Sequence, residues 1–560
     1  MFFVQFFTEL AALPRFSSAL RALPLIFLAG LLALPVLALL AAWLPWGSGT
    51  NGAATAAILR EMASTVLPGY IWTTLWLGLW VALGAAVIGT ATAAAVTLFE
   101  FPGRRTFEWL LLLPLAMPAY VTAYAYTDFL QFSGPLQVGL RAALGLEGRL
   151  LPEVRSLWGA IWVFTFALYP YVYLLARTAL GERAAHLMEA ARLLGAPLSR
   201  RIGSIALPLA RPAVAAGVAL ALMETLADFG VTSYFGIQTF TTGILKAWLS
   251  MDNRLAAAQL ATMLLALVLL LLWLEHRAER RMRFTAKGSS HSGATEGQPV
   301  VLRGWQRGLA WAVCALPVLM GFVAPIVFML RPLASDWAVL PWARFLEWAW
   351  NSVRLGGITA GLAVAVALVL AFVVRRRPDL LTRGVVQLAS VGYAVPGAVI
   401  VVGLLLPVGW LQENIPQWGV GALITTTALG IVWAYLVRFC AVALQSVQSG
   451  YARIPASLDD SARMLGASSA RLMAQVHWPL LRRSTAAAAL LVFVDVMKEL
   501  PATMVLRPFN SDTLAVVAYQ LARDERLGEA ALPSLALVLV GLVPVILLSR
   551  TLRASGAKGP

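Results

Sequence analysis

The chain has 560 residues, of which 60% are hydrophobic and only 12% are charged. A soluble domain is usually about 45–50% apolar and about 25% charged, so this composition excludes an ordinary soluble protein and indicates a polytopic membrane protein. The formal net charge is +16. In a membrane protein an excess of arginine first concerns topology, so we expect a lipid bilayer, and no nucleic acid, as the partner of these charges.

The apolar runs predict twelve membrane-spanning helices, because about 20 apolar residues cross about 30 Å of hydrocarbon. The first run lacks a following cleavage site of small residues, so we expect a retained span and no signal peptide. The predicted spans lie near residues 23–44, 70–98, 107–132, 157–180, 205–226, 255–274, 308–330, 353–374, 385–407, 420–445, 484–506 and 533–549.

Arginine and lysine residues set the expected orientation of these spans. If the N-terminus is cytoplasmic and the spans alternate, most basic residues fall on the cytoplasmic side, including the basic cluster between residues 275 and 307. The positive-inside rule therefore predicts that both termini are cytoplasmic. The segment 275–307 is also rich in Gly and Ser without a helical apolar period, which is typical of a flexible linker.

A repeat divides the chain into two homologous halves. His186–Arg211 aligns with Ser457–Arg482 at a constant shift of 271 residues, which brings Gly195 onto Gly466. The shift continues downstream, where Asp228 meets Glu499. We expect a first domain over 1–274 with a polar cytoplasmic loop at 186–211, the linker at 275–307, and a second domain over 308–560 with a matching loop at 457–482.

The first loop resembles the EAA loop (E-A-A-x3-G-x9-I-x-L-P) of permease subunits of binding-protein-dependent ABC importers. Its matching residues are Glu189, Ala190, Ala191, Gly195 and Ile205–Pro208. The second loop keeps Asp460, Ala462, Gly466 and Pro479 in register but replaces the first Ala by Ser461. The alternative interpretation is an amphipathic connector at the lipid interface, which the doubled, in-register loop disfavours.

This resemblance implies an all-α polytopic membrane protein with about 12 transmembrane helices, arranged as two six-helix type I ABC importer permease domains. It also implies that the loop residues named above couple transport to two copies of a cytoplasmic ABC ATPase. The chain has no G-x-x-x-x-G-K-[ST] phosphate loop, so we expect ATP and Mg to be used by that partner. This chain itself is expected to bind no cofactor and to have no catalytic residues.

Four acids recur at matching positions near the ends of two predicted spans, Glu224 with Asp495 and Asp228 with Glu499, and one cation, Lys498, lies among them. Charged side chains at membrane depth are costly and usually face a bundle interior or an aqueous path. Their i, i+4 spacing predicts that the two acids of each half share a helix face. We expect a substrate path with no permanent metal site, although carboxylates would suit a transient ferric ion. The alternative is structural, with Lys498 paired to a neighbouring acid and the other acids capping helix ends.

The stretches M-E-T-L-A-D-F-G (residues 223–230) and M-K-E-L-P-A-T-x-x-L-R-P (residues 497–508) resemble ferric-iron ABC importer permeases, in which two permease domains are often fused. The resemblance implies a bacterial inner-membrane importer with a periplasmic binding protein that delivers iron. Thiamine permeases share the fused layout, and polyamine or phosphonate permeases share the fold, so these substrates stay open. A rival of another class is an ion-coupled secondary transporter, which would not need two matched docking loops. A membrane enzyme is not supported, because no nucleophile–base pair or metal-ligand cluster occurs at membrane depth.

Overall fold

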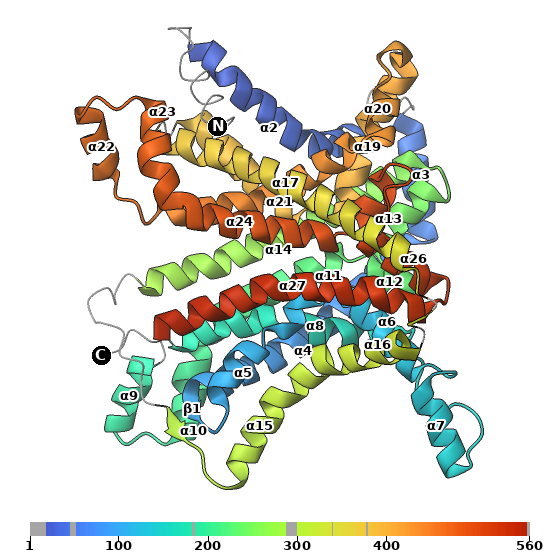
Figure 1. Ribbon diagram of the computed structural model, residues 1–560, viewed down its shortest axis with the longest axis vertical. Helices are drawn as coiled ribbons and strands as arrows, with labels where there is room; N and C mark the ends of the chain where they lie inside the picture. The colour runs from blue at the N-terminus through green and yellow to red at the C-terminus, as the bar shows by residue number, and fades with distance from the viewer. Residues whose placement is uncertain are drawn as a thin grey trace. The chain divides into compact units, whose positions relative to one another are not determined.

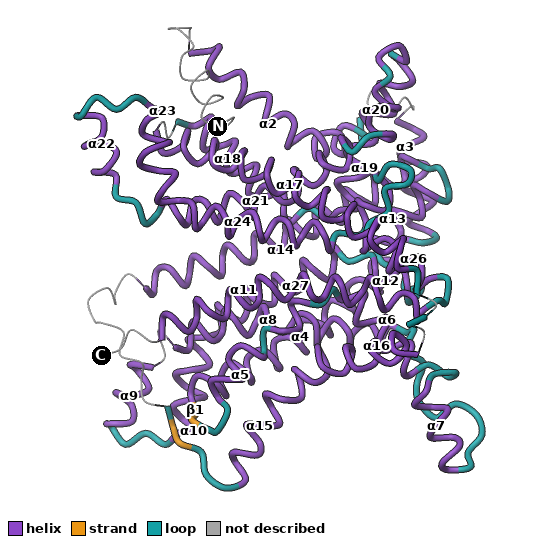
Figure 2. The backbone as a smooth tube through the Cα atoms, in the orientation of Figure 1, coloured by secondary structure: helices purple, strands orange, loops and turns teal. Residues whose placement is uncertain are grey.

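The computed structural model describes residues 18–44, 52–181, 185–286, 299–335, 337–338, 340–376 and 379–556. Its regular structure within these ranges is helical, apart from one pair of two-residue strands (Figures 1 and 2). The expected all-α fold is therefore confirmed.

Ten helices of the described part are long and apolar enough to cross a membrane, or eleven if one bent pair counts as a span. This agrees with a polytopic protein and is slightly fewer than the twelve predicted spans. The ten are α2 (Ser18–Ala41), α4 (Leu67–Leu98), α8 (Leu157–Ala179), α10 with α11 (Leu198–Arg201 and Leu207–Ala227), α14 (Arg254–Ala286), α15 with α16 (Trp305–Val318 and Ala324–Ser335), α17 (Trp342–Arg376), α19 (Gly397–Asn414), α21 (Leu429–Tyr451) and α27 (Leu527–Gly556).

Two predicted spans are broken by proline at matching places. The span predicted at 107–132 is α5 (Arg104–Leu110), a 3₁₀ turn and α6 (Ala119–Leu130), with a bend of 89°. The span predicted at 385–407 is α18 (Leu380–Val391), a 3₁₀ turn and α19. Each break ends at a proline, Pro118 or Pro396, and the residue before it is extended, because proline disfavours the helical conformation of its predecessor.

Two further predicted spans have other boundaries. The span predicted at 420–445 comprises α20 (Val420–Thr426) and α21. The span predicted at 484–506 comprises α24 (Trp478–Lys498) and α25 (Pro501–Leu506), separated by Glu499 and Leu500. Because α24 carries Arg482, Arg483, Asp495 and Lys498, an apolar window is a weak guide to its limits.

The shorter helices follow the same order in both halves of the sequence. Each docking loop, for example, contains a helix, one short helical turn and a π-helical turn that leads into the next span. The remaining helices are α3 (Gly52–Ser64), α7 (Pro135–Leu144), α9 (Ala185–Leu193), α12 (Gly230–Tyr234), α13 (Phe240–Leu249), α22 (Ala456–Met464), α23 (Ser469–Arg471) and α26 (Leu514–Arg523).

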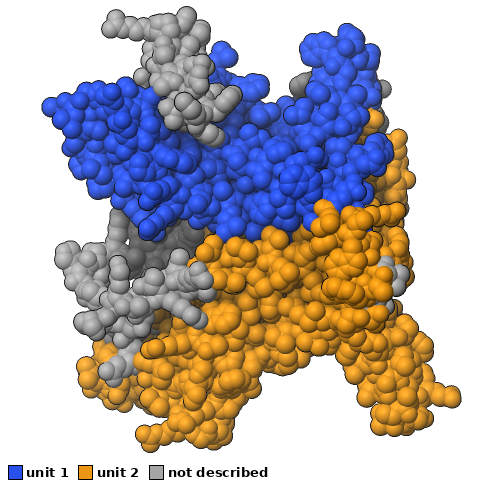
Figure 3. Space-filling model, viewed as in Figure 1, with its two compact units in different colours: residues 1–55, 347–513 blue, residues 56–346, 514–560 orange. Residues whose placement is uncertain are grey.

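The chain forms two compact units that do not coincide with the two halves of the sequence (Figure 3). Unit 1 comprises residues 1–55 and 347–513, and unit 2 comprises residues 56–346 and 514–560. In unit 1, α2 from the start of the chain packs on α18 and α19; in unit 2, α15, α16 and α27 from the second half pack with α4 and α6. The predicted domain limits, 1–274 and 308–560, follow the sequence repeat and stay a prediction of where the two homologous domains begin and end.

A small parallel ladder anchors the beginning of the second half within unit 2. Strand β1 (Phe99–Glu100), at the end of α4, pairs with β2 (Val300–Val301). The indole N–H of Trp311 on α15 then donates to the carbonyl oxygen of Pro102 over 3.0 Å. Helix α14 continues to Ala286, into the segment predicted as a linker, and residues 287–298 of that segment lie outside the described residues.

Candidate functional site

Each predicted docking loop contains a short helix that ends at a glycine in the left-handed region. Gly195 follows α9 with φ +80°, and Gly466 follows α22 with φ +79°. The N–H of Ala196 donates to the carbonyl oxygen of Ala191 over 2.9 Å, and that of Gly195 to Arg192 over 3.0 Å. The second loop repeats this pair of bonds, from Ala467 to Ala462 over 3.0 Å and from Gly466 to Arg463 over 2.9 Å. This is the Schellman arrangement, which requires positive φ at its turning residue and therefore favours glycine.

An exposed apolar pair stands directly before the glycine in each loop. Leu193 and Leu194 are 83% and 88% exposed, and Met464 and Leu465 are 88% and 87% exposed. Large apolar side chains so fully exposed at two matched positions are typical of an interaction surface. We call these residues the loop tips.

The acids of the two loops make the same local contact. Glu189 lies 3.7 Å from Arg192, and Asp460 lies 3.6 Å from Arg463, each pair spaced i, i+3 on its helix. All four side chains are largely solvent-accessible, so these pairs contribute little to stability. Ala190 is exposed, whereas Ala191 and Ala462 are half-buried and supply the carbonyl oxygens of the Schellman bonds. The structure thus brings the predicted loop residues of each half together on one short helix and its turn.

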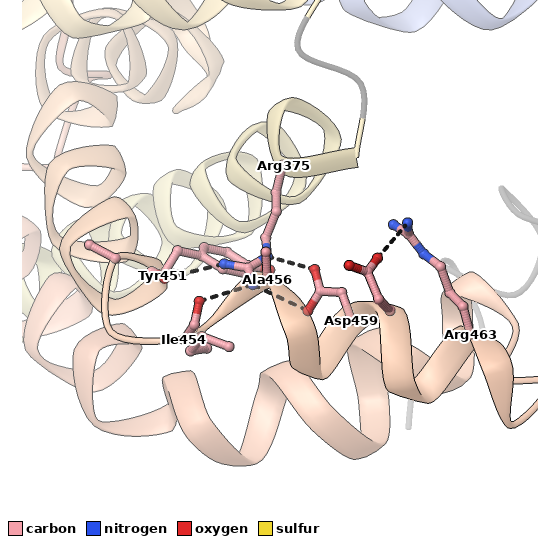
Figure 4. Close-up of a pocket in the computed structure, with 8 residues that line it drawn as sticks. Arg375, Tyr451, Ile454, Ala456, Asp459 and Arg463 are labelled. Atoms are coloured by element: carbon pink, nitrogen blue, oxygen red, sulfur yellow. Dashed lines mark hydrogen bonds and ion pairs between the residues drawn. The ribbon is translucent and has the colours of Figure 1, made fainter.

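The second loop has an anchor that the sequence analysis missed. Arg375, at the end of α17, donates from Nε to Asp459 of α22 over 2.7 Å, and from Nη2 over 3.2 Å (Figure 4). Its Nη1 and Nη2 also donate to the carbonyl oxygens of Tyr451, Ile454 and Pro455. The guanidinium therefore joins α17 to both the loop helix and the end of α21.

The buried His477 completes this network from the other side. Its Nε2 lies 2.9 Å from the Asp459 carboxylate, and its Nδ1 lies 3.2 Å from the Tyr451 hydroxyl. Since the carboxylate can only accept, Nε2 carries a proton and donates it. Burial by itself raises the pKa of Asp459, but the hydrogen bonds from Arg375 and His477 hold that pKa below its usual value.

A pocket of about 360 Å³ opens beside this anchor, and Figure 4 shows its lining. Its charged lining residues are already paired with one another, Arg375 with Asp459 and Arg463 with Asp460. The lining residues are Arg375, Tyr451, Ala452, Ile454, Ala456, Asp459, Asp460 and Arg463.

The predicted path acids Asp228 and Glu499 make matching contacts, each within its own unit. Asp228 follows α11 and accepts from the backbone N–H of Val231 in α12 over 2.9 Å. Glu499 follows α24 and accepts from the corresponding N–H of Ala502 in α25 over 3.1 Å. In both cases a buried threonine four residues on, Thr232 or Thr503, donates to the carbonyl oxygen of the acid. The acids therefore satisfy free N–H groups at a helix start.

The prediction that the two acids of each half share a helix face is wrong. Helix α11 ends at Ala227 and α24 ends at Lys498, and the acid that follows is extended in each case. Asp228 and Glu499 therefore leave the helix that carries Glu224 or Asp495. Those two residues and Lys498 are half-buried near the ends of α11 and α24.

Glu499 has a cationic partner that the sequence analysis did not predict. Its almost fully buried carboxylate lies 3.2 Å from Nη1 of Arg438 on α21, so its partner is not only a neighbour in sequence. The Tyr435 hydroxyl also hydrogen-bonds Thr503. A Cβ atom at Gly397 would lie 2.5 Å from the Glu499 carboxylate, so glycine there makes room for the ion pair. Among the described residues, no group of three or more His, Cys, Asp or Glu side chains could hold a metal ion.

Most of the missed residues share one signal. At the shift of 271, Tyr451, Asp459 and His477 align with Leu180, Met188 and Ala206, all of which are buried. A polar residue at a repeat position that is apolar in the other half could have indicated a buried polar contact. Arg438 gives the same signal, because it aligns with the buried Ala167, whereas Arg375 aligns with Arg104 and gives none.

Comparison with known proteins places these features in a family. The model of the binding-protein-dependent transport system inner membrane component matches twice, over residues 85–284 and 357–555. The chain is 25% identical over 476 residues to the Fe(3+)-transport system permease protein FbpB 2 of Haemophilus influenzae, covering 84% of this chain and 87% of that protein.

Two further relatives differ in the extent of the match. A probable ABC transporter permease protein, y4fN of Sinorhizobium fredii, is 24% identical, covering 86% of this chain and 87% of its own length. A putative 2-aminoethylphosphonate transport system permease protein, PhnU of Salmonella choleraesuis, is 28% identical but covers only 41% of this chain and 82% of its own length. With two matched domains and apolar helices throughout, the chain belongs to the binding-protein-dependent transport system inner membrane component family, as a fused, multi-pass inner-membrane ABC importer permease similar to ferric-iron permeases.

Proposed function

We propose that this chain is the transmembrane permease of an ATP-driven importer, which takes ferric iron from a periplasmic binding protein and moves it into the cytoplasm by alternating access. The observation that carries the ATP-driven part is the doubled docking loop, with its Schellman turn and exposed tip. Two copies of a cytoplasmic ABC ATPase would each engage one loop. Both loops and both termini would then face the cytoplasm, as the distribution of basic residues predicts.

Ferric iron is supported by the relatives that match most of the chain. Two of them are named as ferric-iron permeases, from Haemophilus influenzae and Actinobacillus pleuropneumoniae. The relative named for 2-aminoethylphosphonate matches less than half of the chain. Carboxylates such as Asp228 also suit a hard cation. Thiamine, a polyamine or a phosphonate is the alternative cargo.

The ATPase partner is tested by purifying the tagged chain in mild detergent and identifying what accompanies it. We expect two copies of an ABC ATPase for each copy of this chain, as the doubled loop predicts. A secondary transporter would instead purify without an ATPase and would transport in ATP-depleted vesicles driven by an ion gradient.

The cargo is tested by uptake of radiolabelled ferric iron into cells whose other iron routes are deleted. We expect uptake that depends on this chain and on ATP. Labelled thiamine, putrescine and 2-aminoethylphosphonate are measured in parallel in the same strain. Chain-dependent uptake of one of these compounds in place of iron would replace the iron proposal but leave the importer class intact.

A further inference from the structure

The two docking loops are anchored to the membrane helices by different chemistry. In the second loop, Asp459 is buried between Arg375 of α17 and His477 of the π-helical turn that leads into α24. These contacts join α22 to the π-helical turn that follows it and to α17, whose Arg375 lies 84 residues before Asp459. A charge-assisted hydrogen bond is stronger and more directional than an apolar contact, so it fixes the orientation of α22 relative to α17 and α24.

The first loop has an apolar anchor at the same repeat positions. Leu180, Met188 and Ala206 replace Tyr451, Asp459 and His477, and all three are buried. At these three positions of the described chain, α9 is held by apolar packing, which fixes no donor–acceptor geometry. The chain therefore contains its own evidence that a loop of this fold can be packed without the polar network.

We propose that Asp459 is a positioning residue for the ATP-driven step, which ties the second docking helix to α17 and α24 so that these three elements move as one body. At the matching positions of the first loop, the described residues offer apolar packing in place of this tie. The two loops would then make unequal contributions to transport. This inference rests on the proposed function, since it requires an ATPase that displaces the loops.

The charge network can be separated from its packing role by a triple variant, Tyr451→Leu/Asp459→Met/His477→Ala. This variant gives the second loop the residues that the first loop has at the same positions. Arg375 keeps its backbone carbonyl acceptors at Tyr451, Ile454 and Pro455, which no side-chain change removes. We expect parental amounts of chain in the membrane and parental ATPase co-purification.

The readouts are ATP hydrolysis by the co-purified complex in nanodiscs and ferric-iron uptake by cells. We expect hydrolysis within about twofold of the parent, but uptake lowered at least about fivefold, which is the lower end of typical coupling between sites. The single variant Asp459→Asn, which keeps the shape and loses the charge, should lie between the parent and the triple variant. Met188→Leu in the first loop is the matched control and should take up iron at a rate within about twofold of the parent, because an apolar side chain of similar volume replaces another at the position of Asp459.

Two outcomes would overturn the inference. Parental uptake by the triple variant would show that the network transmits nothing that apolar packing cannot. A loss of chain or of ATPase in proportion to the loss of uptake would show that the network only stabilises the fold. Failure of the parent chain itself to bind an ATPase or to take up iron would instead count against the proposed function, so the two failures are distinguishable.

Discussion

Asp228 and Glu499 show how one repeat position acquires two different environments. Both acids accept a backbone N–H at the start of the next short helix, so both have a local structural role. Glu499 also has a buried ion pair, with Arg438. A test of their predicted place on the substrate path must therefore separate the charge from the hydrogen bond at the helix start.

Asp228→Asn makes this separation. An asparagine oxygen can accept the same N–H from Val231, and Asn and Asp are about equally good at helix starts, so thermal stability should hardly change. If Asp228 contacts the cargo, uptake should fall about tenfold, since a hydrogen bond to a charged group contributes about 1.5–3 kcal/mol. The measurement is labelled-iron uptake at equal amounts of membrane-inserted chain. Parental uptake by this variant would make Asp228 structural and place the path elsewhere.

Glu499→Gln should behave differently, because it leaves Arg438 buried without its counter-charge. Removing one partner of a buried pair typically costs about 3–5 kcal/mol, so we expect a clear loss of thermal stability of the purified chain. The double variant Arg438→Met/Glu499→Gln removes both charges and should recover part of that stability. If the double variant loses as much stability as the two single variants lose together, the broken ion pair does not explain the loss in Glu499→Gln.

At the scale of elements, each predicted docking loop combines a helix-ending glycine, which the sequence shows, with an exposed apolar surface, which only the structure shows. The Schellman turn follows from glycine at the end of each helix, and the bonds repeat in both halves. The exposed apolar tips then follow from the turn, because they are the last residues before it. The two loops therefore present the same kind of short helix end, once in each half of the chain.

Substitution of Gly195 or Gly466 tests the turn. A Cβ atom at either position would meet no neighbouring atom within 4 Å, so the main effect within the chain is on the positive φ angle. An alanine there costs about 1–2 kcal/mol, and asparagine less, since its side chain tolerates this region. We expect Gly195→Asp and Gly466→Asp to lower uptake and to uncouple or release the ATPase, with normal insertion.

The graded series Gly→Asn, Gly→Ala and Gly→Asp serves as the control for these variants. ATPase co-purification and uptake should fall least in the asparagine variant, because it retains the turn without an added charge. Normal uptake by both aspartate variants would remove the reason to consider these loops docking sites.

At the scale of the whole molecule, the compact units and the sequence halves divide the chain differently. Helix α2 belongs with the second-half helices of unit 1, while α15, α16, α26 and α27 belong with unit 2. Each unit thus contains elements of both halves. The boundary predicted between the homologous domains therefore does not separate the two compact units. Separate expression of residues 1–274 or 308–560 would remove packing partners from both units.

The predicted orientation is tested by labelling of single cysteines. The native Cys314 and Cys440 are both fully buried, so the background of a membrane-impermeant thiol reagent should be low. A cysteine at Ser289, which lies in the part of the linker outside the described residues, should react only from the cytoplasmic side. A cysteine at Ser133, between α6 and α7, should react only from outside. Labelling from the opposite side at either position would contradict the prediction that both termini are cytoplasmic.

The sequence by itself determined the membrane class, the doubled domain and the position of both predicted docking loops. Each of these depends on local signals: apolar runs long enough to cross a bilayer, a constant shift between halves, and a glycine that ends a helix. The prolines at Pro118 and Pro396 also break their spans locally, and the continuous spans predicted there were wrong because hydropathy alone does not register the backbone restriction before proline.

The tertiary structure decided the contacts that join distant residues. Arg375 and Asp459, or Arg438 and Glu499, are separated by many helical turns, and no periodicity specifies which buried charges will meet. The grouping of α2 with unit 1 and of α27 with unit 2 is likewise a matter of long-range packing. Apolar helix faces can pack against many partners, and the choice among them depends on side-chain shape across the whole bundle.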